Sequence, residues 1–321
     1  MMGIRTRVNA INFMPKAACI LQAAFAVFLI GCSQPFQKGE GDMQYKILTD
    51  KGGAHIGIDD FVSFSYIEEA EDGRVISSSD DFDARPALMF RERSAFKGDL
   101  FAGLGLLSEG DKAVFKINRD SLLHFSGRKK LAAVKGQYIV YRVKIGTVIS
   151  RGNLSDQLFN NKIEGLRAAE INKARDREAD KIADFAAAHD VHEGPANGLR
   201  YKVLKQGAGK KALPGDTVEV NYTAGFLSGK VFETTYRLVA EEAEVYNPLL
   251  PYKPMALTIS GGAALSGFEQ AMLMFPKGTE ALLVIPSALA YGAQGNGSIL
   301  PYTPVTCTIS ISDIKFQRSH D

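Results

Sequence analysis

The chain has 321 residues, 45% of them hydrophobic, and a formal net charge of +2 at neutral pH. This length is enough for about two globular domains, and the hydrophobic content allows each of them to bury a core. The near-neutral charge gives no reason to invoke nucleic acid or an acidic partner, so both classes are set aside.

The first 31 residues have the features of an export signal. Arg5 and Lys16 precede an apolar run over residues 17–30. This run is shorter than the roughly 20 residues that a membrane-spanning helix needs, but it suits the core of a signal peptide. A signal peptide over 1–31 is therefore predicted, and the mature protein is expected to be exported.

The apolar run ends in Leu29-Ile-Gly-Cys32, which resembles the lipobox of bacterial lipoproteins. In that family the cysteine becomes the lipidated first residue. The resemblance implies lipidation of Cys32, followed by a flexible tether over 32–42. It also implies attachment to the membrane in the bacterial cell envelope, at the outer membrane and facing the periplasm. A chance cysteine after an ordinary signal peptide is the alternative.

Two long segments of the chain repeat one another. Gln44-Tyr-Lys-Ile-Leu48 matches Arg200-Tyr-Lys-Val-Leu204 at an offset of 156 residues, and the same offset pairs Tyr66 with Tyr222. After the next turn the offset is 168, so the later copy carries 12 additional residues. This insertion, before Lys253, is interpreted as either a substrate-contacting rim or a surface loop. A repeat of this length indicates two similar domains, because solenoid repeats are far shorter.

Both copies have the pattern of strands around one short helix. Residues 217–222 and 305–311 alternate between the two faces of a strand, and 281–285 is a continuous apolar strand. Residues 267–275 form the one helical stretch that the pattern predicts in the later copy. This combination indicates an α+β fold.

The segment between the copies has a different composition. From Leu154 to about Val191 it is rich in Ala, Glu, Lys, Arg and Asp and contains no proline. Its apolar residues recur mostly at steps of three and four, which is typical of a helix with a narrow apolar stripe. We predict a helical linker over 151–194. It is interpreted as a solvated spacer that leans on one domain, and the alternative is a helix through which the protein forms a homodimer.

The later copy contains five motifs in a fixed order. They are Val218-Glu-Val-Asn-Tyr222, Ser228-Gly-Lys-Val-Phe232-Glu233, Gly267-Phe268-Glu269, Ile285-Pro286 and Ala290-Tyr291-Gly292-Ala-Gln-Gly295. This series resembles the FKBP-type peptidyl-prolyl cis-trans isomerases. The resemblance implies two antiparallel half-barrels, each wrapped on a short helix, with the isomerase domain over 195–321. It also implies isomerisation of X–Pro bonds with no cofactor and no metal.

This reaction needs a dry pocket more than it needs a reactive group. Resonance in the amide opposes rotation by about 18–20 kcal/mol, and X–Pro bonds exchange over tens to hundreds of seconds. In the twisted transition state the resonance is lost, so the carbonyl oxygen carries less charge and requires less water. An apolar, aromatic-lined pocket therefore stabilises the twisted state relative to the planar one.

The resemblance assigns roles to residues of the later copy. Phe268 would form the pocket floor, Tyr222 and Phe232 its walls, and Tyr291 would donate its hydroxyl to the substrate carbonyl. Glu233, where the family usually has Asp, completes the catalytic set. The remaining pocket positions, implied to bind the substrate, are Met255, Leu257, Ala264, Leu265, Ile299 and Cys307. Cys307 replaces an aromatic residue that is usual in the family.

The earlier copy, over 43–150, keeps the scaffold but lacks the aromatic residues. Ile76 takes the place of Phe232, Ser77 that of Glu233 and Leu100 that of Phe268, and no Tyr-Gly pair follows. It is predicted to be a degenerate, non-catalytic domain.

The sequence as a whole predicts an isomerase that assists the folding of exported proteins. Its expected partners are unfolded or proline-containing exported polypeptides. The alternative is a non-catalytic chaperone or binding scaffold with a vestigial isomerase pocket.

Overall fold

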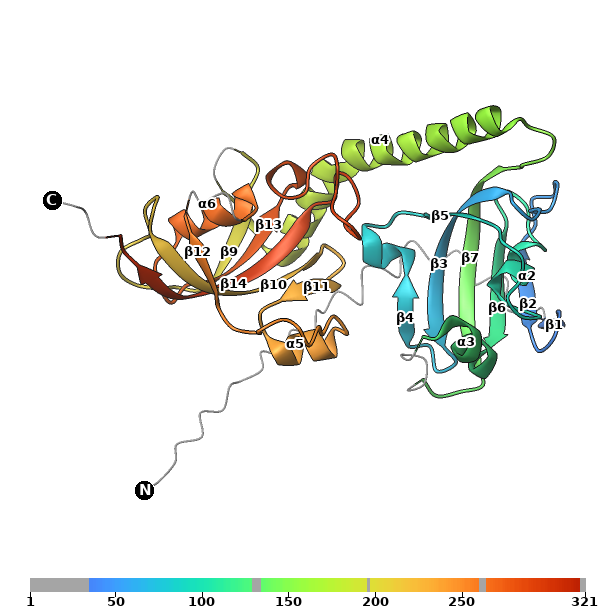
Figure 1. Cartoon of the computed structure of the whole chain (residues 1–321), viewed down its shortest axis with the longest axis horizontal. Helices are drawn as coiled ribbons and strands as arrows, with labels where there is room; N and C mark the ends of the chain where they lie inside the picture. The colour runs from blue at the N-terminus through green and yellow to red at the C-terminus, as the bar shows by residue number, and fades with distance from the viewer. Residues whose placement is uncertain (1–34, 129–133, 195–196, 260–263, 318–321) are drawn as a thin grey trace, which may run out of the picture.

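The computed structural model describes residues 35–128, 134–194, 197–259 and 264–317. They form two lobes, which we call the N-terminal lobe (up to residue 150) and the C-terminal lobe (from residue 192), and a long helix connects them (Figure 1). The predicted signal peptide and Cys32 lie outside the described residues. Within the described part of the chain, no helix has both the length and the apolar character required to cross a membrane.

The N-terminal lobe is an antiparallel sheet with short helices. The strands run in the order β1-β2-β6-β7-β3-β4, and β5 pairs with β3. The strands are β1 (Gln37–Lys38), β2 (Gln44–Thr49), β3 (Phe61–Ala70), β4 (Val75–Ser78), β5 (Ala87–Phe90), β6 (Lys112–Asn118) and β7 (Tyr138–Ile149). The helices are the 3-10 helix η3 (Ser79–Phe82), α2 (Leu100–Leu104) and α3 (Arg119–Ser126).

The C-terminal lobe repeats this topology strand for strand. Its order is β8-β9-β13-β14-β10-β11, and β12 pairs with β10. The strands are β8 (His192–Glu193), β9 (Arg200–Lys205), β10 (Thr217–Phe226), β11 (Val231–Thr234), β12 (Met255–Thr258), β13 (Glu280–Ile285) and β14 (Val305–Lys315). The helices are α5 (Arg237–Glu242), α6 (Ser266–Met274) and the 3-10 helix η5 (Ser287–Leu289). The predicted α+β class is confirmed.

Equivalent hydrogen bonds stabilise the same positions in the two lobes. The buried Asp60 accepts backbone N–H bonds from Gly57 and Arg151, both at 2.7 Å. Its equivalent Asp216 accepts them from Leu213 at 2.8 Å and from Gln317 at 2.7 Å. Each carboxylate therefore fastens the end of the last strand to the start of the central strand, so the repeat extends to tertiary contacts.

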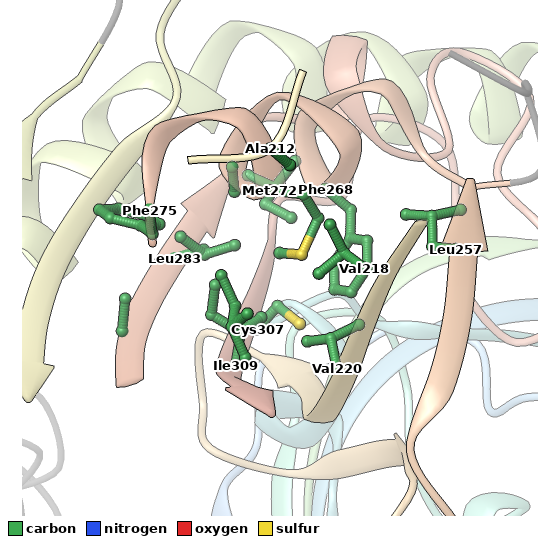
Figure 2. Packing of buried hydrophobic residues seen from close by; sticks show 14 of the residues in the cluster. Ala212, Val218, Val220, Leu257, Phe268, Met272, Phe275, Leu283, Cys307 and Ile309 are labelled. Carbon is green, nitrogen blue, oxygen red and sulfur yellow. The ribbon is translucent and has the colours of Figure 1, made fainter. Parts of the chain in front are cut away.

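The core of the C-terminal lobe lies between α6 and the sheet (Figure 2). Met272 on α6 is fully buried and packs with Val218, Leu283 and Ile309 from three strands. Burying one such side chain stabilises the fold by about 1.5–3 kcal/mol. A methyl group added at Gly267 would lie 2.6 Å from Ile285, so the glycine permits the helix to approach β13. This packing fixes the position of Phe268, the next residue.

The linker is the helix α4 (Asp156–His189), as the sequence predicts. At roughly 1.5 Å per residue it is about 50 Å long. Its first turns pack on the N-terminal lobe through Phe159 and Ile163, and its last turns pack on the C-terminal lobe through Ile182 and Ala186. The interpretation that it leans on one domain was therefore too narrow, because the apolar stripe is long enough to serve both lobes.

Each lobe has one α-helix, and one short 3-10 helix, beyond the single helix that we expected. In the N-terminal lobe the additional α-helix is α3, whose start is capped by Asn118 Oδ1, which accepts from Ser121 N–H at 2.9 Å, and whose end is Gly127 in a left-handed conformation. In the C-terminal lobe α5 belongs to the 12-residue insertion. It buries Ala240 but leaves Leu238 78% exposed.

Candidate functional site

Aromatic side chains from four elements converge in the C-terminal lobe. Tyr222 on β10 meets Phe268 on α6 edge to face, with ring centroids 5.5 Å apart. Phe232 on β11 contacts Phe226 at 5.2 Å and Tyr291, which follows η5, at 6.4 Å. These edge-to-face arrangements suit the quadrupoles of the rings. We call the five residues the aromatic cluster.

The local structure explains why these rings meet. Tyr222 and Phe226 are four residues apart on β10 and therefore point to the same face of the sheet. The hairpin to β11 brings Phe232 back beside Phe226, and a register shift occurs between Ala224 and Gly225. Bulges of this kind re-aim side chains next to functional sites. Phe226 was missed in the sequence, although its period-two spacing from Tyr222 was a usable signal.

Glu233 contacts the aromatic cluster through a hydrogen bond to a tyrosine hydroxyl. The Tyr222 hydroxyl donates to Glu233 Oε1 at 2.6 Å. Burial, followed by this bond to the carboxylate, raises the pKa of Tyr222. The pKa of Tyr291 is also raised, by burial first and then by the charge of Glu233. Both phenols are consequently neutral at physiological pH, and neither can serve as a proton acceptor.

Cys307 lies on β14, is 3% exposed and belongs to the same packed core as Phe268 (Figure 2). Burial, and secondarily the charge of Glu233, raises the pKa of its thiol. Since the thiolate is the reactive form of cysteine, the neutral buried thiol acts here as a small apolar group. It takes part in the packing of the core.

The other predicted pocket residues lie at different depths. Met255, Ala264 and Leu265 are half-buried and pack against the core that holds the cluster, whereas Leu257 is fully inside that core. Ile299 is buried on the loop between η5 and β14 but is not part of the same packed core. Within the described ranges, no group of three or more His, Cys, Asp and Glu residues could hold a metal ion.

The equivalent place in the N-terminal lobe holds an ion pair. Arg128 donates two hydrogen bonds to Glu68, at 2.7 and 2.9 Å, and the Tyr141 hydroxyl donates a third at 2.9 Å. Glu68 is only 3% exposed. It pairs with Tyr141 across the strands β3 and β7, and the equivalent pair across β10 and β14 in the C-terminal lobe is Ala224 with Cys307. This trio leaves no local signal in the sequence, because Glu68 and Arg128 are 60 residues apart.

A cleft of about 860 Å³ lies between the lobes. One side is formed by β4 and by Arg128 of the N-terminal lobe, and the other by Lys230 and the end of α5. β4 and β11 are the terminal strands of their sheet orders, and they face one another in this region (Figure 1). The cleft therefore opens beside the hairpin that carries Phe232.

The fold and the cluster define a class: α+β half-barrel proteins whose sheet holds an aromatic cluster against a short helix. The model of the family described as FKBP-type peptidyl-prolyl cis-trans isomerase matches residues 208–311. FK506-binding protein 2 of Candida glabrata is 31% identical over 111 residues, which cover 33% of this chain and 72% of that protein. The chain therefore belongs to the FKBP-type peptidyl-prolyl cis-trans isomerase family.

Longer matches come from bacterial relatives. The FKBP-type peptidyl-prolyl cis-trans isomerase FkpA of Escherichia coli is 25% identical over 255 residues, covering 72% of this chain and 82% of FkpA. Outer membrane protein MIP of Legionella longbeachae is 28% identical over 174 residues, covering 52% of this chain and 68% of that protein. The crystal structure of Escherichia coli FkpA aligns with a TM-score of 0.40 and 27% identity, covering 51% of this chain and 74% of that one. The protein is a peptidyl-prolyl cis-trans isomerase, and its substrates are polypeptides that contain proline.

Proposed function

We propose that the aromatic cluster is the site at which the C-terminal lobe isomerises X–Pro bonds. The single observation that carries this proposal is the convergence of Tyr222, Phe232, Phe268 and Tyr291 from four separate elements. Phe268 forms the floor on α6, and Tyr222 and Phe232 form the walls. Such a surface offers little hydration, so it stabilises an amide whose carbonyl has lost resonance charge on twisting.

Within this proposal, Tyr291 is the residue that donates to the substrate carbonyl. Tyr222 has one hydroxyl hydrogen, and that hydrogen is donated to Glu233. Glu233 thereby orients the Tyr222 ring and takes no part in proton transfer. Of the six substrate-binding positions, we propose that Met255, Ala264 and Leu265 contact the peptide. The more deeply buried three, Leu257, Ile299 and Cys307, shape the pocket from behind.

The N-terminal lobe, proposed as a domain over 43–150, has no isomerase activity in this scheme. Its pocket position is filled by Glu68, Arg128 and Tyr141, and three hydrogen bonds to the buried Glu68 hold them together. A charged group there would keep water at the amide and remove the advantage of a dry site. The C-terminal domain is proposed to span 195–321, with the linker over 151–194.

We further propose that the protein works on exported polypeptides from a lipid anchor at Cys32, after removal of residues 1–31 and with 32–42 as a tether. The lipobox-like sequence supports this location in the bacterial cell envelope, at the outer membrane and facing the periplasm. A relative named as an outer membrane protein agrees with it. For α4 we favour a brace within one chain over a homodimer contact, since each end of its apolar stripe is covered by a lobe of the same chain.

A swap of residues between the lobes tests the isomerase site. In the full chain, Phe232→Ile and Phe268→Leu introduce the residues of the N-terminal lobe at both positions. Each change keeps an apolar side chain, so the lobe should fold. We expect kcat/KM in a protease-coupled prolyl-peptide assay to fall by at least about tenfold, which corresponds to roughly 1.4 kcal/mol of transition-state binding. An unchanged rate would refute the proposed site. A wild-type chain that is no faster than the uncatalysed reaction would instead favour a non-catalytic chaperone, for which the interlobe cleft would be the binding surface.

A further inference from the structure

The loop that carries Tyr291 is bonded mainly to itself. It runs over residues 287–303, from η5 to the start of β14. Gly292 N–H donates to Ser287 O at 2.8 Å, and Tyr302 N–H donates to Gly292 O at 2.9 Å. These bonds tie the two arms of the loop together. The loop is also held by its own lobe, where Ser266 Oγ on α6 donates to Leu289 O at 3.4 Å and Tyr291 packs against the core. The place of Tyr291 further depends on the bonds that reach the loop from outside that lobe.

One arm of the loop is held by the linker helix. Glu178 on α4 accepts from the backbone N–H of Ser287 at 2.6 Å and from its hydroxyl at 2.8 Å. Ser287 is buried, and it is the first residue of η5. No side chain within η5 caps its start, since Pro286 occupies that position. Glu178 thus supplies the missing cap of η5 through charge-assisted hydrogen bonds to Ser287. Ser287 lies three residues before Ala290 and four before Tyr291.

The other arm is held by the N-terminal lobe. Arg85 Nη2 donates to the carbonyl of Pro301 and to Thr303 Oγ1, the latter at 3.2 Å. Asp83 fixes the guanidinium with a 3.0 Å ion pair. The side chains of Arg85 and Asp83 are 9% and 4% exposed, so solvent screens the pair weakly. Arg85 of the N-terminal lobe therefore binds the Tyr291 loop of the C-terminal lobe.

The contacts to both arms of the loop originate from one face of α4. Lys181 contacts Asp83 Oδ1 at 2.8 Å, and it lies three residues after Glu178, hence on the same side of the helix. One turn of α4 thus bonds the first arm directly and the second arm through Asp83 and Arg85.

We propose that Arg85 and Glu178 are positioning residues for isomerisation. They set the location of Tyr291 from outside the C-terminal lobe and do not touch the substrate. The N-terminal lobe, inert by itself, then contributes to the reaction through the loop it holds. This inference rests on the proposed function, in which Tyr291 donates to the substrate carbonyl.

The test uses the full chain and the prolyl-peptide assay. Glu178→Gln and Arg85→Ala should each lower kcat/KM roughly three- to thirtyfold, the range expected for changes along a coupled network. Arg85→Lys should recover part of the loss, since a lysine can still donate to the Pro301 carbonyl. The matched controls are Glu164→Gln on the exposed part of α4 and Arg142→Gln on β7, which should keep the wild-type rate.

A double-mutant cycle separates positioning from general destabilisation. In a Tyr291→Phe background, Glu178→Gln should cost less than about twofold, because the hydroxyl that it positions is gone. A full, additive loss in that background would overturn the inference, as would wild-type rates for both Glu178→Gln and Arg85→Ala alongside a loss in Phe232→Ala. Wild-type activity of Phe232→Ala itself would instead overturn the proposed site and this inference with it. Circular dichroism of each variant checks the fold, and Arg85→Lys replaces Arg85→Ala should the latter not fold.

Discussion

Replacing Phe232 by alanine should strongly reduce catalysis. The ring is half-buried and makes two edge-to-face contacts, with Phe226 at 5.2 Å and with Tyr291 at 6.4 Å. Each such pair contributes about 0.5–1.5 kcal/mol, so the two together correspond to about 1–3 kcal/mol. Because the ring is proposed as a wall of the dry site, we expect the twisted amide to lose ring contacts of comparable energy in the transition state when Phe232 is removed. The rate constant kcat/KM should then fall roughly five- to 150-fold.

The assay follows cis-to-trans conversion of a prolyl tetrapeptide coupled to proteolysis, at several enzyme concentrations. Ile76→Ala is the matched control, since Ile76 occupies the position of Phe232 in the N-terminal lobe at the offset of 156 residues. It should leave kcat/KM unchanged. Equal losses in both variants would mean that the change acts through stability or lobe packing, and a wild-type rate for Phe232→Ala would refute the dry-pocket mechanism.

Three further predictions concern pH, stability and location. The wild-type rate should be nearly constant from about pH 6 to 8, because no acid–base step is involved. The ordinary pKa of a tyrosine is about 10 and that of Tyr222 is raised further, so this phenol stays neutral throughout that range. A bell-shaped profile that disappears in Glu233→Gln would contradict this prediction. Arg128→Ala should lower the free energy of unfolding of the N-terminal lobe by about 2–3 kcal/mol in urea titrations, because it leaves the buried Glu68 with an uncompensated charge; Glu68→Gln in addition should restore part of it. Cys32→Ser should move the protein from the membrane to the soluble fraction on cell fractionation, as the apolar run is too short to anchor it without lipid, and continued membrane association would contradict the lipobox interpretation.

Local sequence patterns determined most of the scaffold. Alternation with period two predicted β10 and β14, and the run of three- and four-residue steps predicted α4. These patterns are reliable because a strand and a helix each impose a fixed spacing on the side chains that face a core. The offset of 156 residues likewise revealed that Tyr66 and Tyr222 have equivalent places, and both strands bear this out in their pairing.

The aromatic cluster could be named residue by residue only through a family resemblance, since a single phenylalanine in a strand is ordinarily core. What the sequence could not supply was the depth of each residue. Leu257 and Cys307 were grouped with Met255 as substrate contacts, yet they lie inside the core. Depth depends on how α6 packs across the sheet, which no local spacing encodes.

Contacts between distant segments were decided by the tertiary structure alone. Glu68 and Arg128 are 60 residues apart, Glu178 and Ser287 are 109 apart, and Arg85 and Thr303 are 218 apart. Charged residues are common and usually solvated, so their sequence carries no signal of a buried partner. Only the folding of two half-barrels against one helix brings these charged side chains to their distant partners. It also buries Glu68 and Arg85, whose charges must then be paired or hydrogen-bonded, because an unpaired buried charge is costly.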